Sequence, residues 1–162
     1  MKNNLSPLRY PGGKTQVYEF VRELIELNGS LTYIEPYMGG MGIALKLLLN
    51  NNVQKIMVND YDKAIYAFWY SVLNYTDYLI NLIETTPITI EEWKKQRIIQ
   101  QNKDVSEDLL ELGFSTLFLK IDLEMKALIL RRDTTNIFLD LLSIYLTLNA
   151  VSSSLTTSFL IL

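Results

Sequence analysis

A glycine-rich turn between two β-prone runs constrains the fold of this chain more than any other feature. The first run covers residues 31–35, and the turn PYMGGMG follows it at residues 36–42. An apolar stretch of helical length comes next at residues 43–49, and the second run, at residues 55–59, ends at Asp60. Strand, helix and strand in this order predict a βαβ unit with parallel strands and flanking helices.

The turn and the acid together predict a site for an adenosine ligand. Gly39, Gly40 and Gly42 let a ligand approach the backbone, and the next helix presents free N–H groups to a carboxylate. Asp60 lies 18 positions after Gly42, near the spacing at which nucleotide-binding α/β folds place an acid for ribose hydroxyls. Because the turn lacks the G-x-G-x-x-G pattern, we expect an adenosine with a carboxylate rather than a dinucleotide. An ordinary turn and a strand-ending Asp are the alternative.

A second motif, LRYPGGK at residues 8–14, precedes the first predicted helix. Gly12 and Gly13 permit a tight turn at the helix start. Tyr10 can stack on a flat base, and Lys14 can pair with a carboxylate. A simple N-terminal turn with a solvated lysine is the alternative.

The residue types present limit the chemistry available to the chain. It has 162 residues, enough for one domain, and contains neither Cys nor His. Thiolate chemistry, disulfides, zinc fingers and Ser-His-Asp triads are therefore excluded. Carboxylates, Lys, Tyr, backbone amides or a bound cofactor must supply any activity, and we expect no metal. No apolar run follows the first residues, MKNNLSPLRYPGGK, so we expect no signal peptide and a cytoplasmic protein.

Charge patterning argues against a basic nucleic-acid binder as a whole, because the formal net charge is −3. Lys94, Lys95 and Arg97 form a local basic cluster, which indicates either a solvated helix face or contact with DNA phosphates. Residues 143–162 are uncharged but rich in Ser, Thr and Asn, so we do not expect a membrane-spanning helix there.

Hydrophobic periodicity and capping residues predict four further helices, at residues 15–28, 63–84, 89–101 and 106–120. Asp62 is expected to cap the second, and Thr89 with Glu92 forms a capping box for the third. Seven aromatic residues lie on or just before the second helix, and core or interface packing is a better explanation for them than base stacking: Tyr61, Tyr66, Phe68, Trp69, Tyr70, Tyr75 and Tyr78.

The distribution of turn residues divides the chain. Every Gly lies at or before Gly113, and every Pro at or before Pro87. A folded α/β domain needs turn chemistry throughout. We therefore expect an organised region at residues 1–120 and an aberrant tail at residues 121–162, of the kind that a frameshift would produce.

Three motifs in order, PLRYPGGK, YIEPYMGGMG and IMVNDYDKAIYAFW, resemble the Dam-like class of adenine-specific DNA methyltransferases. The resemblance runs from about Ser6 to Leu119. It implies a Rossmann-like methyltransferase fold, S-adenosylmethionine (SAM) as the methyl donor and the N6 amine of adenine in double-stranded DNA as the acceptor. It also implies the kind of site-specific methylation found in restriction-modification systems, and places the start of a target-recognition insertion at residues 89–111.

The resemblance implies a set of cofactor-binding residues drawn from all three motifs. They are Tyr10, Gly12, Gly13, Lys14, Pro36, Gly39, Gly40, Gly42 and Asp60.

The chain departs from the family pattern in one important respect. The family's catalytic strand end carries a Pro-Pro-aromatic motif, and this chain has no Pro-Pro pair. That motif would hold the amine hydrogens and stack on the flipped base. We therefore assign no catalytic residue and expect an incomplete fold, inactive alone and open to complementation by a second fragment. A non-catalytic adenosine-nucleotide-binding or interaction module is the alternative, and a small helical interaction protein is a weaker one.

Overall fold

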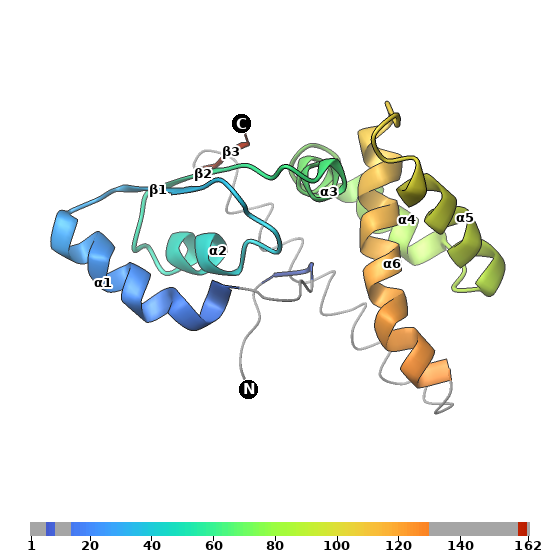
Figure 1. Cartoon of the computed structure of the whole chain (residues 1–162), viewed down its shortest axis with the longest axis horizontal. Helices are drawn as coiled ribbons and strands as arrows, with labels where there is room; N and C mark the ends of the chain where they lie inside the picture. The colour runs from blue at the N-terminus through green and yellow to red at the C-terminus, as the bar shows by residue number, and fades with distance from the viewer. Residues whose placement is uncertain (1–5, 9–13, 130–158, 162) are drawn as a thin grey trace.

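The computed structural model describes residues 6–8, 14–129 and 159–161, with side chains described up to residue 120 (Figure 1). The elements in chain order are η1 (Lys14–Val17), α1 (Tyr18–Asn28), β1 (Thr32–Glu35), α2 (Gly42–Leu49), β2 (Lys55–Val58), α3 (Lys63–Asn74), α4 (Thr76–Thr85), α5 (Ile90–Gln101), α6 (Leu109–Ile129) and β3 (Phe159–Ile161).

The three strands form a parallel sheet in the order β1-β2-β3. Glu35 pairs with Val58 at the carboxyl end of β1, and Val58 pairs with Ile161 on the other side. The predicted βαβ unit is therefore confirmed. The third strand was not predicted, because it lies in the segment taken for a tail. The described residues are mostly helical and do not show a complete methyltransferase sheet.

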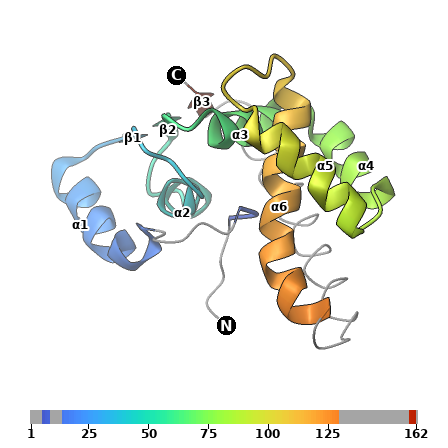
Figure 2. The same ribbon diagram turned by 45° about the vertical axis from the view of Figure 1, so that its right-hand side comes forward.

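Helices α1 and α2 lie on the same face of this sheet (Figures 1 and 2). Glu35, Ile56 and Val58 alternate along the strands on the buried side. Ile34 is 57% exposed on the opposite side. Fully parallel sheets normally bury both faces. The described residues of β1 and β2 instead alternate between more buried and more exposed positions, as in a sheet that is covered on one side.

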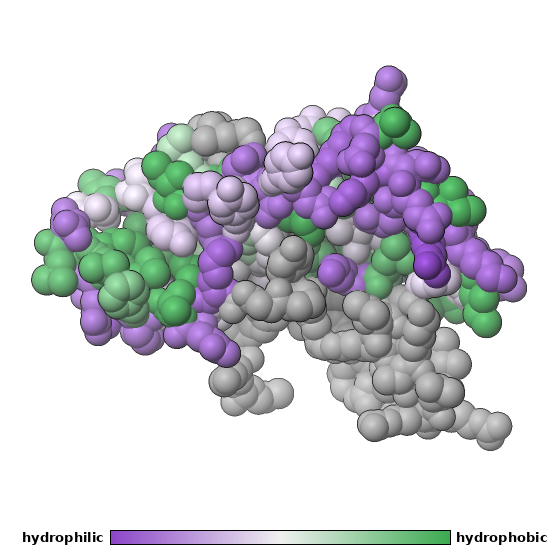
Figure 3. Space-filling model, in the orientation of Figure 1, coloured by the Kyte–Doolittle hydropathy of each residue, from purple (hydrophilic) through white to green (hydrophobic). Residues whose placement is uncertain are grey.

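The amphipathic helix predicted at residues 15–28 is confirmed as η1 and α1, but its apolar face is only partly covered. Tyr18 and Ile25 are buried. Phe20 is 62% exposed and Leu27 is 82% exposed, and apolar side chains gather over α1 on the surface (Figure 3). The apolar spacing thus identified the helix correctly and overestimated how much of it packs.

The single helix predicted at residues 63–84 is wrong, because the chain bends at Tyr75 between α3 and α4. Tyr75 has φ −138° and ψ 36°, outside the helical region. Its N–H still donates to the Ser71 carbonyl at 2.9 Å, and the Leu79 N–H donates to the Tyr75 carbonyl at 2.8 Å. The bend lets α4 bury Leu79 and Ile80 while no Gly or Pro marks it.

The aromatic residues of this region divide between core and surface. Phe68 and Trp69 are fully buried, as predicted, and pack edge to face with ring centroids 4.9 Å apart. Tyr61 is 94% exposed and Tyr78 is 62% exposed, so neither belongs to the core, and interface packing stays a prediction for them.

Helix α6 packs closely against α3 through small residues. The Ser71 hydroxyl donates to the Leu109 carbonyl at 3.1 Å, and the Thr116 hydroxyl donates to the Ala64 carbonyl at 3.2 Å. Helix α6 continues to Ile129, so the boundary predicted at residue 120 falls inside a helix. Neither α6 nor any other helix among the described residues is long and apolar enough to cross a membrane.

Gly113 sets how closely α6 approaches α3. An added Cβ would lie 2.6 Å from the Ala67 carbonyl oxygen and 2.5 Å from the Ser71 hydroxyl. We expect Gly113→Ala to lower the free energy of unfolding by about 1–3 kcal/mol through overpacking, even though helix propensity favours alanine by about 1 kcal/mol. Thermal denaturation measures this loss.

Gly29→Ala is the comparison variant, because Gly29 has φ +62° and no neighbour within 4 Å of an added Cβ. Its cost, about 1–2 kcal/mol, comes from the backbone alone. An unchanged or raised melting temperature in Gly113→Ala would contradict the close packing of α3 and α6.

Candidate cofactor site

The candidate site lies where the parallel strands β1 and β2 end. The Asn59 N–H donates to the Glu35 carbonyl at 3.0 Å, and the Met38 N–H donates to the Asn59 carbonyl at 2.8 Å. These two bonds extend the strand pairing into the following loops, so the turn at residues 36–41 and the segment at residues 59–62 lie side by side. Ligands of open α/β sheets bind at this edge, outside the carboxyl ends of the strands.

Gly39 and Asp60 are brought into direct contact. The Gly39 N–H donates to Asp60 Oδ2 at 2.8 Å. On the other side of the same residue, the buried Trp69 Nε1–H donates to the Gly39 carbonyl at 2.8 Å. Gly39 has φ 48°, a left-handed conformation that glycine adopts without strain. The turn is therefore held at both its donor and its acceptor.

Asp60 keeps acceptor capacity for a ligand. Its Oδ1 accepts the Asp62 N–H at 3.0 Å while Oδ2 accepts the Gly39 N–H. A carboxylate offers about four lone-pair sites, so about two remain. Asp62 accepts the Ala64 N–H at 3.0 Å and caps α3, as predicted.

Helix α2 begins at the end of the glycine turn without a side-chain cap. Its N-cap residue, Met41, has φ 53° and is fully buried. A left-handed methionine costs about 1–2 kcal/mol, and such strain is concentrated at functional sites. Gly42 follows, and an added Cβ there would lie 2.6 Å from Thr15 Oγ1. Gly42 therefore allows η1 to approach α2 closely, a packing role in addition to the predicted one.

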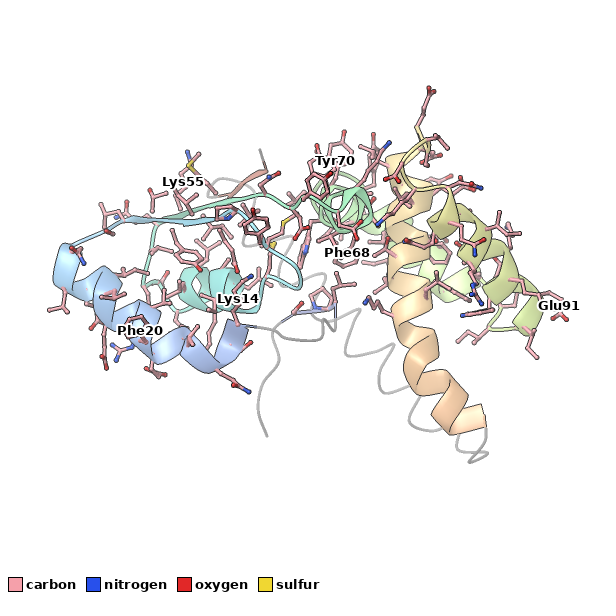
Figure 4. The ribbon with its side chains drawn as sticks, viewed as in Figure 1. Lys14, Phe20, Lys55, Phe68, Tyr70 and Glu91 are labelled. Carbon is pink, nitrogen blue, oxygen red and sulfur yellow. The ribbon has the colours of Figure 1, made fainter. Side chains whose placement is uncertain are left out.

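Lys14 forms an ion pair within the protein. Its Nζ donates to Glu35 Oε1 at 2.8 Å and also to the Tyr37 carbonyl. Lys14 remains 46% exposed, whereas Glu35 is 4% exposed. Figure 4 shows Lys14 on the side of the sheet that carries α2. The carboxylate that Lys14 contacts in the structure is therefore that of Glu35, a residue of the same chain.

Glu35 is the buried acid of the site, and its Oε2 has no hydrogen-bond partner among the residues that the structure describes. Burial raises the pKa of Glu35; the Lys14 ammonium and the Ala44 N–H oppose this, and the nearby Asp60 adds to it. Burial, with a smaller contribution from Glu35, also raises the pKa of Tyr33 to about 12. The pair Lys14–Glu35 therefore places one exposed positive charge and one free, buried carboxylate oxygen beside the turn.

The structure brings most of the predicted site residues together and leaves some undescribed. Lys14 is tied to β1 and to the turn, and Asp60 is tied to Gly39. Pro36, Gly40 and Gly42 belong to the same turn or its helix. Tyr10, Gly12 and Gly13 lie outside the described residues, so their roles stay predictions.

Two residues that hold the site together were not predicted to do so. Glu35 follows Ile34 in a predicted strand, so their side chains lie on opposite faces of the sheet. This alternation could have identified Glu35 as a buried residue. Trp69 was interpreted only as a packing residue, because hydrophobic periodicity does not reveal what an indole N–H will bond to.

Tyr37 and Tyr61 flank the site from the two loops and are 70% and 94% exposed.

The basic cluster on α5 is partly occupied by intramolecular contacts. The Arg97 guanidinium lies 5.1 Å from the centre of the Trp93 ring, and Lys95 Nζ lies 3.5 Å from Glu92 Oε1. The Glu92 N–H donates to the Thr89 hydroxyl at 3.1 Å, so Thr89 caps α5. The Thr89 N–H donates to the Pro87 carbonyl, so only half of the predicted capping box is confirmed. DNA contact by Lys94, Lys95 or Arg97 stays a prediction.

Comparison with known proteins relates the chain to a family. The family model for D12 class N6 adenine-specific DNA methyltransferase matches residues 10–146. No curated protein matches the chain. The matched range covers the whole candidate site and also residues 121–146, within the segment expected to be an aberrant tail. The division at residue 120 stays a prediction.

The protonation of Glu35 gives a pH-dependent prediction. Because burial raises the pKa of Glu35 above its ordinary value of 4.5 in the folded chain, the folded state binds this proton more tightly than the unfolded state. The stabilising contribution of Glu35 is therefore present below pH 4.5 and is lost as the pH rises through the folded-state pKa. We expect the melting temperature of Glu35→Gln, relative to wild type, to increase over that range.

Melting curves of both proteins between about pH 4 and pH 8 test this, because the other titrating groups cancel in the difference. A difference that instead decreased with pH would show that the ion pair with Lys14 outweighs burial.

Proposed function

The chain belongs to the D12 class N6 adenine-specific DNA methyltransferase family, and on that basis we propose that its turn at residues 36–42, Asp60 and the Lys14–Glu35 pair bind SAM. The observation that carries this proposal is the direct bond from the Gly39 N–H to Asp60 Oδ2 at 2.8 Å. It joins the two elements that the sequence predicts for one adenosine ligand.

The groups at the site suit the chemistry of SAM. The N-terminus of α2 and the exposed Lys14 ammonium favour a carboxylate, as on the methionine part. The free oxygen of buried Glu35 favours an ammonium, as on the same part of the cofactor. The remaining acceptor capacity of Asp60 favours hydroxyls, as on the ribose. SAM supplies an electrophilic methyl group on a sulfonium centre, and these residues bind and orient it.

We propose that the methyl acceptor is the N6 amine of adenine in double-stranded DNA, as the family description indicates. Helices α4 to α6 form a separate helical layer beside the sheet, joined to it through α3 (Figures 1 and 2). The predicted start of a target-recognition insertion, residues 89–111, includes α5 and the loop after it. The exposed Lys94 and Arg97 on α5 suit phosphate contacts.

The chain has no Pro-Pro-aromatic motif. We propose that it binds SAM but does not complete methyl transfer by itself, and that a second polypeptide segment would have to hold the adenine amine. In an assay with tritiated SAM and plasmid DNA, we expect no transfer of label above background by this chain. Robust incorporation would contradict the proposal.

Asp60 tests cofactor binding. Calorimetry with SAM should show binding to the wild type and about 10- to 100-fold weaker binding to Asp60→Ala, the loss expected for hydrogen bonds to a charged group. Asp77→Ala removes an equal charge at an exposed position on α4 and should leave the affinity unchanged.

Equal affinity of the wild type for SAM, ATP and NAD would instead support a general adenosine-nucleotide-binding module. Unchanged SAM affinity in Asp60→Ala would remove Asp60 from the site.

A further inference from the structure

Two lysines cross between the loop that joins α5 to α6 and the start of α3. Lys103 Nζ donates to Asp62 Oδ1 at 2.8 Å. In the opposite direction, Lys63 Nζ donates to the Asp104 carbonyl at 3.1 Å. Figure 2 shows this loop at the end of α6 that lies beside α3. The loop is therefore fastened to the segment that leaves β2, and not only to its own helices.

The contact of Lys103 continues into the candidate site. Asp62 accepts from Lys103, and its own N–H donates to Asp60 Oδ1 at 3.0 Å. Asp60 Oδ2 accepts the Gly39 N–H at 2.8 Å. Three consecutive hydrogen bonds thus lead from an ammonium on the helical layer to the glycine turn.

We infer that Lys103 is a positioning residue for the SAM site, which couples occupancy of Asp60 and the glycine turn to the loop between α5 and α6. This inference rests on the proposed function. Lys103 does not contact the glycine turn; it orients Asp62 and, through the Asp62 amide, Asp60.

The charges of Asp60, Asp62 and Lys103 explain why Lys103 matters at this position. Asp60 and Asp62 lie two positions apart at the end of β2, so this short segment carries two acidic residues. The side chains of Lys103 and Asp62 are only 34% and 38% exposed, so solvent screens their interaction less than that of a fully exposed pair. Lys103 therefore places a positive charge on the acidic segment that carries Asp60.

The two helices that the loop joins, α5 and α6, are also bonded to each other. The Ser115 hydroxyl on α6 donates to the Gln96 carbonyl on α5 at 2.8 Å, and Gln100 Nε2 donates to the Thr116 hydroxyl at 2.5 Å. A change at the loop is thus shared by α5 and α6. Because coupling between two sites is reciprocal, a ligand that orders Asp60 should also order this loop.

The test compares Lys103→Met with Lys103→Arg, which keeps the charge, and with Lys55→Met. Lys55 is exposed on β2 in the sheet, far from the loop (Figure 4), and its loss changes the net charge equally. We expect Lys103→Met to weaken SAM binding about two- to five-fold, the effect of a partly exposed ion pair. Lys103→Arg should restore the affinity, and Lys55→Met should retain it.

Amide hydrogen exchange provides a readout that needs no ligand. In the free protein, Lys103→Met should speed exchange of the Gly39 and Asp62 amides. A second measurement adds SAM, which should protect residues 102–108 in the wild type but less in Lys103→Met. Asp62→Asn keeps the helix cap and removes the ion pair. It should therefore have little further effect in a Lys103→Met background.

Unchanged exchange at Gly39 and Asp62 in Lys103→Met would overturn the inference, as would an equal loss of SAM affinity in Lys55→Met. A wild-type chain that binds no SAM would overturn the proposed function and the cofactor part of this inference. The exchange rates of the free protein would still decide whether Lys103 positions the turn.

Discussion

The hydrogen bonds that hold Gly39 between Asp60 and Trp69 are the interaction on which the rest of the site depends. The Gly39 N–H and carbonyl are both satisfied, one by an acid after β2 and one by an indole from α3. A buried backbone group without a partner is costly, so these bonds fix the turn in one conformation. That conformation in turn sets where α2 begins.

Helix α3 connects this turn to the helical layer. Trp69 reaches the turn, while Ala64, Ala67 and Ser71 meet α6, where Gly113 has no side chain. Helix α3 therefore contacts both the candidate cofactor site and helix α6 of the α4–α6 layer. The family relationship gives this arrangement its meaning, since a DNA methyltransferase must place its cofactor and its target strand in a fixed relation.

The sequence was sufficient for features that depend on local patterns. The β1–α2–β2 unit, the Asp60 position and the Asp62 cap all follow from residues that are near one another in the chain. Features that depend on distant residues were missed: β3 pairs with β2 across about a hundred positions, and Lys14 finds Glu35 through the fold. The bend at Tyr75 was missed because tertiary packing of Leu79 and Ile80, rather than Gly or Pro, produces it.

The position of β1 at the edge of the sheet affects how copies of this chain meet one another. Within the described residues, β1 pairs only with β2, so its outer edge presents free N–H and C=O groups next to the exposed Ile34. Such an edge accepts a strand from any neighbouring chain. Edge-to-edge pairing of two copies would make the yield of single, folded molecules fall as the concentration of the chain rises.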